Sequence, residues 1–544
     1  MARYLGFGIL MAFLGSWDAA GAHAQTVMRQ WNPLGFQFVD SLPDLDGDGF
    51  RELVIGDDRY PSPLLLYGRV LALSSLTNQP IYSYPGTTKN MRLGGGLSVL
   101  GDVSRDGFPD FGASSILGTF VFDGRTGVPL FSTPAQSSCM APMGDMNGDD
   151  TPEFLINGRF MYAGGTFEYL YGIFPPPNAT GFGISQAKLG DIDADGIDDL
   201  VIGAPGSGSF LIFGRAYVYS GASGQLIYEL VGEEPDGFFG QHLVSPGDLN
   251  GDGVSDLVVA APRDLVQSSS GFGVGRLYFY DGPTGQLFAK VESAGYYFDL
   301  GSVLLAAGDV NGNGFGDLLA FQRQDLPTSP ARTYGLIIDG GTREVIYQMS
   351  GFGPFVGGGY DWNGNGFPDF GLYPYPTPLW TLYDGAPIGV TVLGRACTQK
   401  GSEPPRIGAT GVAEIGATFP LHLSRVKPGE TAVLVLGDPR AVLSERFASS
   451  RDCALGLLPM SLLRTPTQEV RPGEGAATVE LAIPNDPTLV GTAFHAQWLV
   501  LDGPEGLRPK ASTRILRVEI QPAGTNPVVR LPGAGPSGRT RQPR

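Results

Sequence analysis

A nonapeptide of the form Asp-x-[Asp/Asn]-x-[Asp/Asn]-Gly-x-x-[Asp/Glu] recurs seven times in this 544-residue chain, with small departures between copies. Successive copies start 43 to 61 residues apart, so each copy belongs to a unit of that length. Self-similarity at such a spacing is typical of repeat architectures, in which every unit is one small supersecondary motif that packs on its neighbours. The repeat therefore limits the fold more than any other feature. The copies start at Asp44, Asp102, Asp145, Asp191, Asp248, Asp309 and Asp361.

The nonapeptide has the composition of a calcium loop. Ca²⁺ takes about six to eight oxygen ligands, and alternate positions 1, 3 and 5 of a tight loop bring three side-chain oxygens together. A backbone carbonyl at position 7 and a carboxylate at position 9 can complete the shell, while glycine at position 6 permits the turn. Carboxylates gathered in one turn repel one another and call for a cation. The predicted ligands are Asp44, Asp46, Asp48, Phe50 and Glu52; Asp102, Ser104, Asp106, Phe108 and Asp110; Asp145, Asn147, Asp149 and Glu153; Asp191, Asp193, Asp195, Ile197 and Asp199; Asp248, Asn250, Asp252, Val254 and Asp256; Asp309, Asn311, Asn313, Phe315 and Asp317; and Asp361, Asn363, Asn365, Phe367 and Asp369.

The nonapeptide is also compatible with two structures other than this calcium loop. An EF-hand begins in the same way but needs a glutamate at position 12 and flanking helices, whereas position 12 is Ile55, Ile202 or Val259 in three copies and β-type sequence follows. A single copy could also be an Asp/Gly turn that holds no ion. Seven copies in register favour calcium.

The copies differ in ways that predict unequal affinity. Ser104 stands at position 3 of the second copy, Asp150 takes the glycine position of the third, and the last two copies have asparagine at positions 3 and 5. We therefore expect the loops at Asp44, Asp191 and Asp248 to bind calcium most tightly and the loop at Asp145 to bind it most weakly.

Each unit contains about four short strands. After the loop comes an apolar strand and then Gly203-Ala204-Pro205 or a related step, followed by an alternating strand, a glycine turn and another strand, as in 216–228. With Phe182-Gly183 before the loop, the unit resembles the FG-GAP repeat of integrin alpha chains, most clearly at 181–220 and 238–280. The resemblance, which extends to secreted bacterial proteins with such repeats, implies blades of four antiparallel strands, calcium loops on one face and ligand binding on another. We predict an all-β chain, with a seven-bladed β-propeller over 25–388.

Outside the repeats, three segments are expected. Residues 1–24 have the pattern of a signal peptide cleaved after Ala24, which predicts a secreted protein with no membrane insertion after cleavage. Residues 389–520 have strands separated by Gly/Pro turns and predict a β-sandwich, similar to modules that follow such propellers in exported bacterial proteins. Residues 521–544 predict a disordered tail. Cys397 and Cys453 could form a disulfide, or both could be free thiols.

Composition and motifs reduce the number of function classes that the chain could have. The formal net charge of −18 argues against nucleic acid as a partner, because phosphates reward positive charge. His242, His422 and His495 have no spacing that suits zinc, and no nucleophile motif or phosphate loop is present. We expect no enzyme, but a monomeric binding or adhesion module for an extracellular protein or glycan. The alternative is a carbohydrate-active enzyme, a polysaccharide lyase or glycosidase, that uses the propeller as a scaffold.

Overall fold

The structure, a computed structural model, describes residues 27–31, 38–62, 64–135, 140–206, 212–264, 274–293, 299–324, 332–350, 352–353, 358–362, 367–374, 380–383, 385, 390–393, 405–409, 413–437, 445–446, 454–455, 459–471, 474–501, 509–512 and 515–522. The described elements are β-strands, apart from one short 3-10 helix, η2 (Pro487–Leu489). Within these ranges no helix has the length and apolar character that crossing a bilayer requires. The predicted signal peptide, almost all of the predicted tail, and the three cysteines lie outside the described residues.

Six antiparallel sheets of four strands follow one another along the chain, each with its strands in sequence order. They are β2 (Phe38–Leu42), β3 (Glu52–Asp57), β4 (Arg69–Leu73) and β5 (Pro80–Pro85); β6 (Leu97–Gly101), β7 (Asp110–Ser115), β8 (Gly118–Phe122) and β9 (Pro129–Thr133); β10 (Met140–Gly144), β11 (Glu153–Ile156), β12 (Phe160–Tyr162) and β13 (Tyr169–Gly172); β14 (Ser185–Gly190), β15 (Asp199–Ala204), β16 (Phe213–Tyr219) and β17 (Leu226–Pro235); β18 (His242–Gly247), β19 (Asp256–Ala261), β20 (Arg276–Tyr280) and β21 (Leu287–Glu292); and β22 (Leu304–Gly308), β23 (Asp317–Gln324), β24 (Arg332–Ile338) and β25 (Val345–Ser350).

A further sheet joins the two ends of the repeat region. Its strands are β26 (Phe352–Gly353), β27 (Gly358–Tyr360), β28 (Asp369–Pro374), β29 (Trp380–Tyr383) and, beside β29, the N-terminal strand β1 (Val27–Trp31). β1 and β29 pair antiparallel. Adding the N-terminal strand of a repeat region to its last sheet ties the two ends of the region together and so helps to close the ring.

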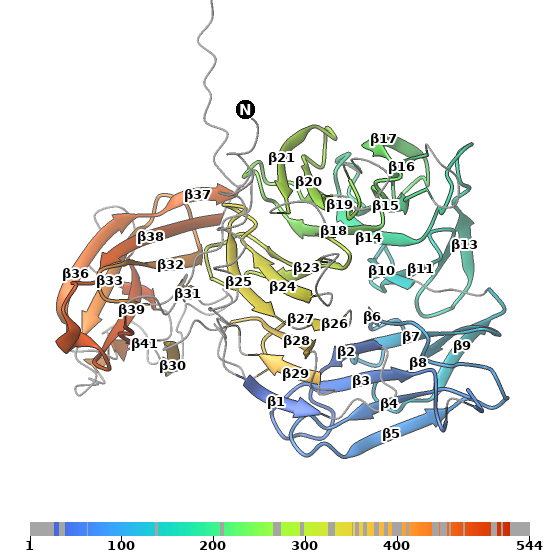
Figure 1. The fold of residues 1–544 in the computed structure, drawn as a ribbon, viewed down its shortest axis with the longest axis horizontal. Helices are drawn as coiled ribbons and strands as arrows, with labels where there is room; N and C mark the ends of the chain where they lie inside the picture. The colour runs from blue at the N-terminus through green and yellow to red at the C-terminus, as the bar shows by residue number, and fades with distance from the viewer. Residues whose placement is uncertain are drawn as a thin grey trace, which may run out of the picture.

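The sheets are arranged around a common centre (Figure 1), and the first strands of neighbouring sheets contact one another from β2 and β6 through to β22 and β27. Between the last sheet and the first, Tyr360 and Trp362 pack with Val39, Leu53 and Ile55. The prediction of an all-β chain with propeller-type sheets is confirmed. The count of seven blades stays a prediction.

The burial of the strands explains their sequences. The second strand of a sheet is buried along its whole length in β3, β7, β15 and β19, which accounts for continuous apolar runs such as Leu257-Val258-Val259. The fourth strands, such as β5 and β21, are partly exposed and contain both apolar and polar residues. Each sheet thus has a buried inner part and a wetter outer edge, which is the arrangement expected of blades.

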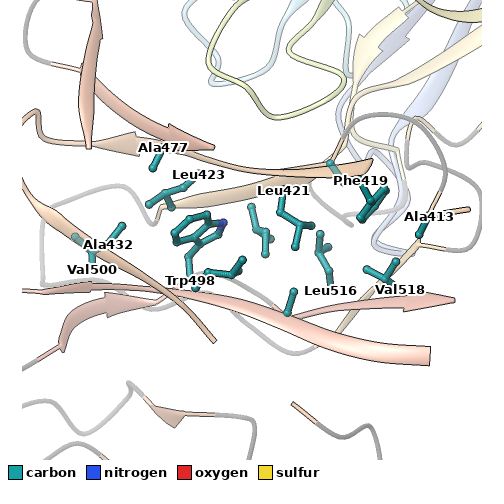
Figure 2. Packing of buried hydrophobic residues seen from close by; sticks show 14 of the residues in the cluster. Ala413, Phe419, Leu421, Leu423, Ala432, Ala477, Trp498, Val500, Leu516 and Val518 are labelled. Atoms are coloured by element: carbon teal, nitrogen blue, oxygen red, sulfur yellow. The ribbon is translucent and has the colours of Figure 1, made fainter. Parts of the chain in front are cut away.

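Two larger sheets follow the ring, with a separate hairpin of β34 (Glu445–Arg446) and β35 (Ala454–Leu455). One sheet contains β30 (Val390–Leu393), β41 (Ile515–Glu519), β39 (Ala493–Leu501), β33 (Thr431–Gly437), β36 (Pro459–Pro466) and β40 (Pro509–Ser512); the other contains β31 (Arg406–Ala409), β32 (Thr418–Val426), β38 (Glu474–Ala482) and β37 (Gln468–Arg471). Figure 2 shows Leu421 and Leu423 of β32 facing Trp498 of β39 and Leu516 of β41. This is the predicted β-sandwich, although its boundaries at 389 and 520 remain a prediction.

Candidate metal-binding loops

All seven nonapeptides have the same place in their sheets. Each connects the first strand to the second, and the residue at position 9 is the first residue of the second strand. Because the sheets surround one centre with their first strands innermost, these loops lie at the same end of every sheet. The geometry therefore gathers the loops on one face of the ring.

The aspartate at position 1 organises the turn. Its carboxylate accepts the N–H of position 6 in the first six loops, at 2.7 to 3.1 Å. Position 6 has a positive φ, such as 90° at Gly49 and 64° at Asp150. Glycine adopts this left-handed conformation without strain, and aspartate is among the side chains that tolerate it. The departure at Asp150 thus leaves the turn of the third loop intact.

The carboxylate at position 9 is fully buried in all seven loops. One of its oxygens accepts a backbone N–H from the turn between the third and fourth strands of the same sheet. The pairs are Ser75–Glu52 (2.7 Å), Gly124–Asp110 (3.0 Å), Gly164–Glu153 (3.3 Å), Gly221–Asp199 (2.9 Å), Gly282–Asp256 (3.1 Å), Gly340–Asp317 (3.0 Å) and Gly385–Asp369 (2.9 Å). This acid therefore fastens the loop to the neighbouring hairpin whether or not it also binds a metal ion.

The second oxygen at position 9 separates the first loop from the others. In the other six loops it accepts a backbone N–H from position 2 or 3 of its own loop, at 2.6 to 2.8 Å. In the first loop Oε1 of Glu52 is buried and has no hydrogen-bond partner, and neither has Oδ2 of Asp48. A buried oxygen without a hydrogen-bond partner loses its hydration and gains no interaction in exchange, unless a cation binds to it.

The loop at Asp44 also has the largest cluster of carboxylates. One oxygen each from Asp44, Asp46, Asp48 and Glu52 lies within 4.8 Å of the others. Burial, followed by the charges of the three aspartates, raises the pKa of Glu52 to about 7, although the Ser75 N–H lowers it. The four predicted side-chain ligands of this loop are thus brought together, and the donor set fits a hard divalent cation.

The loop at Asp191 brings together three of its four predicted acids. Asp191, Asp193 and Asp195 each place an oxygen within 4.8 Å of the others. Asp199 is held apart by its bonds to Ile192 and Gly221. The loop backbone supports the cluster, because the N–H of Asp195 is directed at Asp191 Oδ1, at 3.0 Å.

The loop at Asp248 gathers a residue that the nonapeptide does not contain. Asp252 and Asp256 cluster with Asp281, which lies in the turn after β20. The amide of Asn250 donates to Asp281 Oδ1 at 3.0 Å and so ties this turn to the loop. The Asp-Gly turn recurs at 123–124, 281–282 and 339–340, and this recurrence is the sequence signal that could have identified the extra acid.

Among the described residues, an arginine forms an ion pair with a predicted ligand in two of the loops. In the third loop, Asp149 Oδ2 lies 3.0 Å from Nη2 of Arg105, which belongs to the second loop, and the Arg105 Nε donates to Thr151 Oγ1. In the sixth loop, Asp309 Oδ2 lies 3.5 Å from Nη1 of Arg406 in β31 of the sandwich. Neither arginine was singled out from the sequence, because both contacts join parts of the chain that no local pattern connects.

The remaining loops are less complete. In the second loop Asp110 accepts the backbone N–H groups of Ser104 and Gly124, and burial raises its pKa to about 6. The acids of this loop are not among the described groups of three or more that converge within 4.8 Å. In the seventh loop Asn363 and Asn365 lie outside the described residues. The assignment of all seven loops as metal sites therefore stays a prediction.

The histidines do not form a site. His422 lies in β32 with Nδ1 3.0 Å from Thr478 Oγ1, and burial lowers its pKa to about 4, so it is neutral at physiological pH. Burial also lowers the pKa of His242, and His495 is buried in β39. Among the described residues no histidine enters a group of three or more candidate metal ligands.

The fold and the loops define a class: a β-propeller in which an acid-rich turn joins the first two strands of each sheet. Comparison with known sequences identifies two of the repeats. Residues 185–222 and 242–280 match the FG-GAP repeat, and these stretches contain the first three strands of two sheets, β14–β16 and β18–β20. The chain carries FG-GAP repeats of the integrin alpha type.

Three relatives illustrate the similarity. The chain is 27% identical to integrin alpha-5 of Xenopus laevis over 231 residues, which is 38% of this chain and 21% of the relative. It is 27% identical to integrin alpha-V of Gallus gallus over 220 residues, 37% of this chain and 21% of the relative. It is 33% identical to phosphatidylinositol-glycan-specific phospholipase D of Rattus norvegicus over 188 residues, 30% of this chain and 22% of the relative. The matched region thus spans about a fifth of the length of these relatives.

Proposed function

We propose that the chain is a secreted, calcium-binding β-propeller protein that acts as a non-catalytic binding or adhesion module for an extracellular protein or glycan ligand. Support for the binding role comes from the similarity to integrin alpha chains. Support for the ion comes from the loops, and above all from one observation. Glu52 is fully buried in a cluster of four acids, and its Oε1 has no hydrogen-bond partner.

This arrangement is difficult to sustain without a cation. Three aspartates and a glutamate converge within 4.8 Å, and for Glu52 no described basic side chain forms an ion pair. Like charges at this distance destabilise the folded chain unless some are protonated or a cation is bound. A calcium ion would be held by Asp44, Asp46, Asp48 and Glu52 and would supply charge neutralisation, while the chain itself supplies the turn.

Calcium titration tests the proposal directly. Protein freed of metal by a chelator is titrated with Ca²⁺, and in parallel with Mg²⁺, by calorimetry, and its melting temperature is recorded with and without the ion. Because an ion that binds only the folded state stabilises it, calcium at about 100 times its Kd adds about 2.7 kcal/mol per site. Absence of heat and of any rise in melting temperature would reject a calcium role.

The ligand class needs a separate experiment. Glycan and protein arrays are probed with the mature protein in calcium and in chelator. We expect a defined set of bound glycans or proteins whose signal falls in chelator, because the acid-rich loops hold the hairpins of every sheet in place. An ion requirement for folding with no array signal would leave calcium binding intact and contradict the adhesion role.

An enzyme is the second candidate, because one relative is a phosphatidylinositol-glycan-specific phospholipase D. Release of a glycosylphosphatidylinositol-linked reporter from vesicles, and turnover of polysaccharides, are the corresponding assays. The non-catalytic proposal expects no turnover above a blank in either assay. Turnover that Ca²⁺ supports would overturn it.

A further inference from the structure

We propose that Arg406, from the C-terminal sandwich, takes the place of a metal ion at the loop that starts at Asp309. The same contact fastens the sandwich to the propeller. This inference rests on the proposed function, which is calcium binding at the other loops. It divides the loops into those that bind calcium and one that holds an arginine instead. It also gives the sandwich a role, namely to complete one loop of the ring.

The ion pair lies in a largely closed space. Nη1 of Arg406 is 3.5 Å from Oδ2 of Asp309, and the two side chains are only 14% and 17% exposed. The carboxylates of Asp317 and Asp361 also attract this guanidinium, and the charge of Arg425 opposes it. A single cation thus faces the acids of two adjacent loops, as a bound metal ion would.

The sixth loop presents nitrogen where a calcium loop presents oxygen. The side-chain amides of Asn311 and Asn313 both donate to Oδ2 of Asp339, at 2.5 and 2.8 Å. Their oxygens accept the backbone N–H groups of Asn313 and Phe315, at 3.0 and 2.9 Å. N–H groups cannot coordinate a cation. In the loop at Asp248 only the amide at position 3 donates to the acid of the following turn, from Asn250 to Asp281, whereas in the sixth loop the amides at positions 3 and 5 both do.

The backbone of the sandwich closes over the loop. A Cβ at Gly408 of β31 would lie 2.1 Å from the carbonyl oxygen of Asn311 and 2.5 Å from the Cα of Gly312. Phe367 of the seventh loop is buried in the hydrophobic core of the sandwich, together with Ile407 and Phe419. The loop at Asp309 is therefore covered by β31, and the contact involves charge, backbone and apolar packing at once.

A divalent ion would meet two obstacles here. A guanidinium beside Asp309 repels a second cation brought to the same carboxylate, and burial leaves little water to screen that repulsion. The ion would also have to displace β31, since Gly408 lies against the loop backbone. The geometry points to a loop that folds around a built-in cation and needs no calcium.

Hydrogen exchange of the full chain, followed by mass spectrometry, tests this loop by loop. The chain is measured in chelator and in Ca²⁺. We expect peptides that cover the loops at Asp44, Asp191 and Asp248 to exchange about tenfold more slowly in calcium, since a bound ion suppresses local opening. The peptide that covers 309–317 is expected to exchange at the same rate in both conditions.

Two variants separate charge from packing. Arg406→Gln removes the positive charge. Gly408→Ala keeps Arg406 but pushes β31 away from the loop. Each is expected to speed exchange of the 309–317 peptide in chelator about tenfold, because each removes an interaction that holds this loop closed. Arg517→Gln is the matched control, since Arg517 lies on the other sheet of the sandwich and pairs with Glu519 at 3.3 Å; it should leave the peptide unchanged.

The outcomes keep the two proposals apart. If no loop responds to calcium, the proposed function fails, while the variants in chelator still test the role of Arg406. If calcium slows the 309–317 peptide of the unmutated chain as much as the others, Arg406 does not replace a metal ion. If both variants leave this peptide unchanged, Arg406 does not hold the loop. Should a variant fail to fold, the unmutated chain in the two conditions decides.

Discussion

The loops at Asp44 and Asp309 share the same nonapeptide pattern, and both bury negative charge, but they differ in what lies beside that charge. At Asp44 four acids converge and two buried oxygens have no hydrogen-bond partner. At Asp309 asparagines stand at positions 3 and 5, one buried oxygen of Asp309 has no hydrogen-bond partner, and Arg406 of the sandwich lies beside its other oxygen. The comparison teaches that a cluster of acids in a repeat indicates a metal site only where the fold supplies no other cation.

The largest expected effect comes from removing the partner of Arg406. Asp309→Asn leaves a nearly buried guanidinium without its carboxylate, which typically costs about 3 to 5 kcal/mol. Chemical denaturation should show this loss equally in calcium and in chelator, because no metal ion is involved. A loss that appears only in calcium would show that Asp309 binds the ion instead.

Asp193→Asn is the contrasting variant in the loop at Asp191. Asparagine keeps the oxygen that accepts the Asp195 N–H at 3.2 Å and removes one charge from the cluster. In chelator we expect no loss of stability, because repulsion among the acids is relieved. In calcium the variant should be less stable than the unmutated chain, and equal stability in both conditions would contradict a metal site there.

The pH dependence of stability should show next whether the buried acids of the loops need a cation. The pKa values of Glu52 and Asp256 are each raised to about 7, first by burial. A carboxyl whose pKa is higher in the folded than in the unfolded chain stabilises the fold at low pH, and this contribution is lost as pH rises through the folded value. Melting temperature in chelator should therefore fall between about pH 5 and pH 8.

Calcium should reverse this trend, because the ion binds the ionised carboxylates and its affinity grows as protons leave. The control is Glu52→Gln, which removes one of the carboxyls with a raised pKa and should make the fall in melting temperature in chelator shallower. A melting temperature in chelator that rises steadily from pH 5 to pH 8 would show that these acids are ionised in the folded chain without a cation.

Much of this could be predicted from the sequence, because the repeat is local. The nonapeptide, its glycine and the apolar strand after it lie within one unit, so the strands, the turn and the four clustered acids of the loop at Asp44 could be predicted from spacing. The metal ligands of the seven loops as a set stay a prediction. The contribution of Asp281 was harder to predict. Its Asp-Gly turn recurs in the sequence, but its distance from the loop depends on how β19 pairs with β20. Arg105 and Arg406 were beyond prediction, since their contacts depend on how neighbouring sheets and domains pack.

A smaller effect is expected at the loop that starts at Asp248. Asp281→Ala removes a carboxylate from the cluster with Asp252 and Asp256. Loss of one ligand should weaken calcium binding there by about tenfold, or about 1.4 kcal/mol, which limiting-calcium titration of the loop's exchange protection can measure. Ser220→Ala, at the equivalent turn of the preceding sheet, is the control and should leave the loop at Asp248 unaffected.

The smallest effect is expected at Arg105, and it decides how far the comparison extends. Its pair with Asp149 is exposed, with side chains 53% and 37% accessible, so Arg105→Gln should lower stability by less than about 1 kcal/mol. The loop at Asp145 keeps three acids and an intact turn, and without the arginine its exchange should become calcium-dependent. If the unmutated loop already responds to calcium as strongly as the loop at Asp191, an exposed arginine does not exclude the ion. Burial by a second domain, as at Arg406, would then be the property that does.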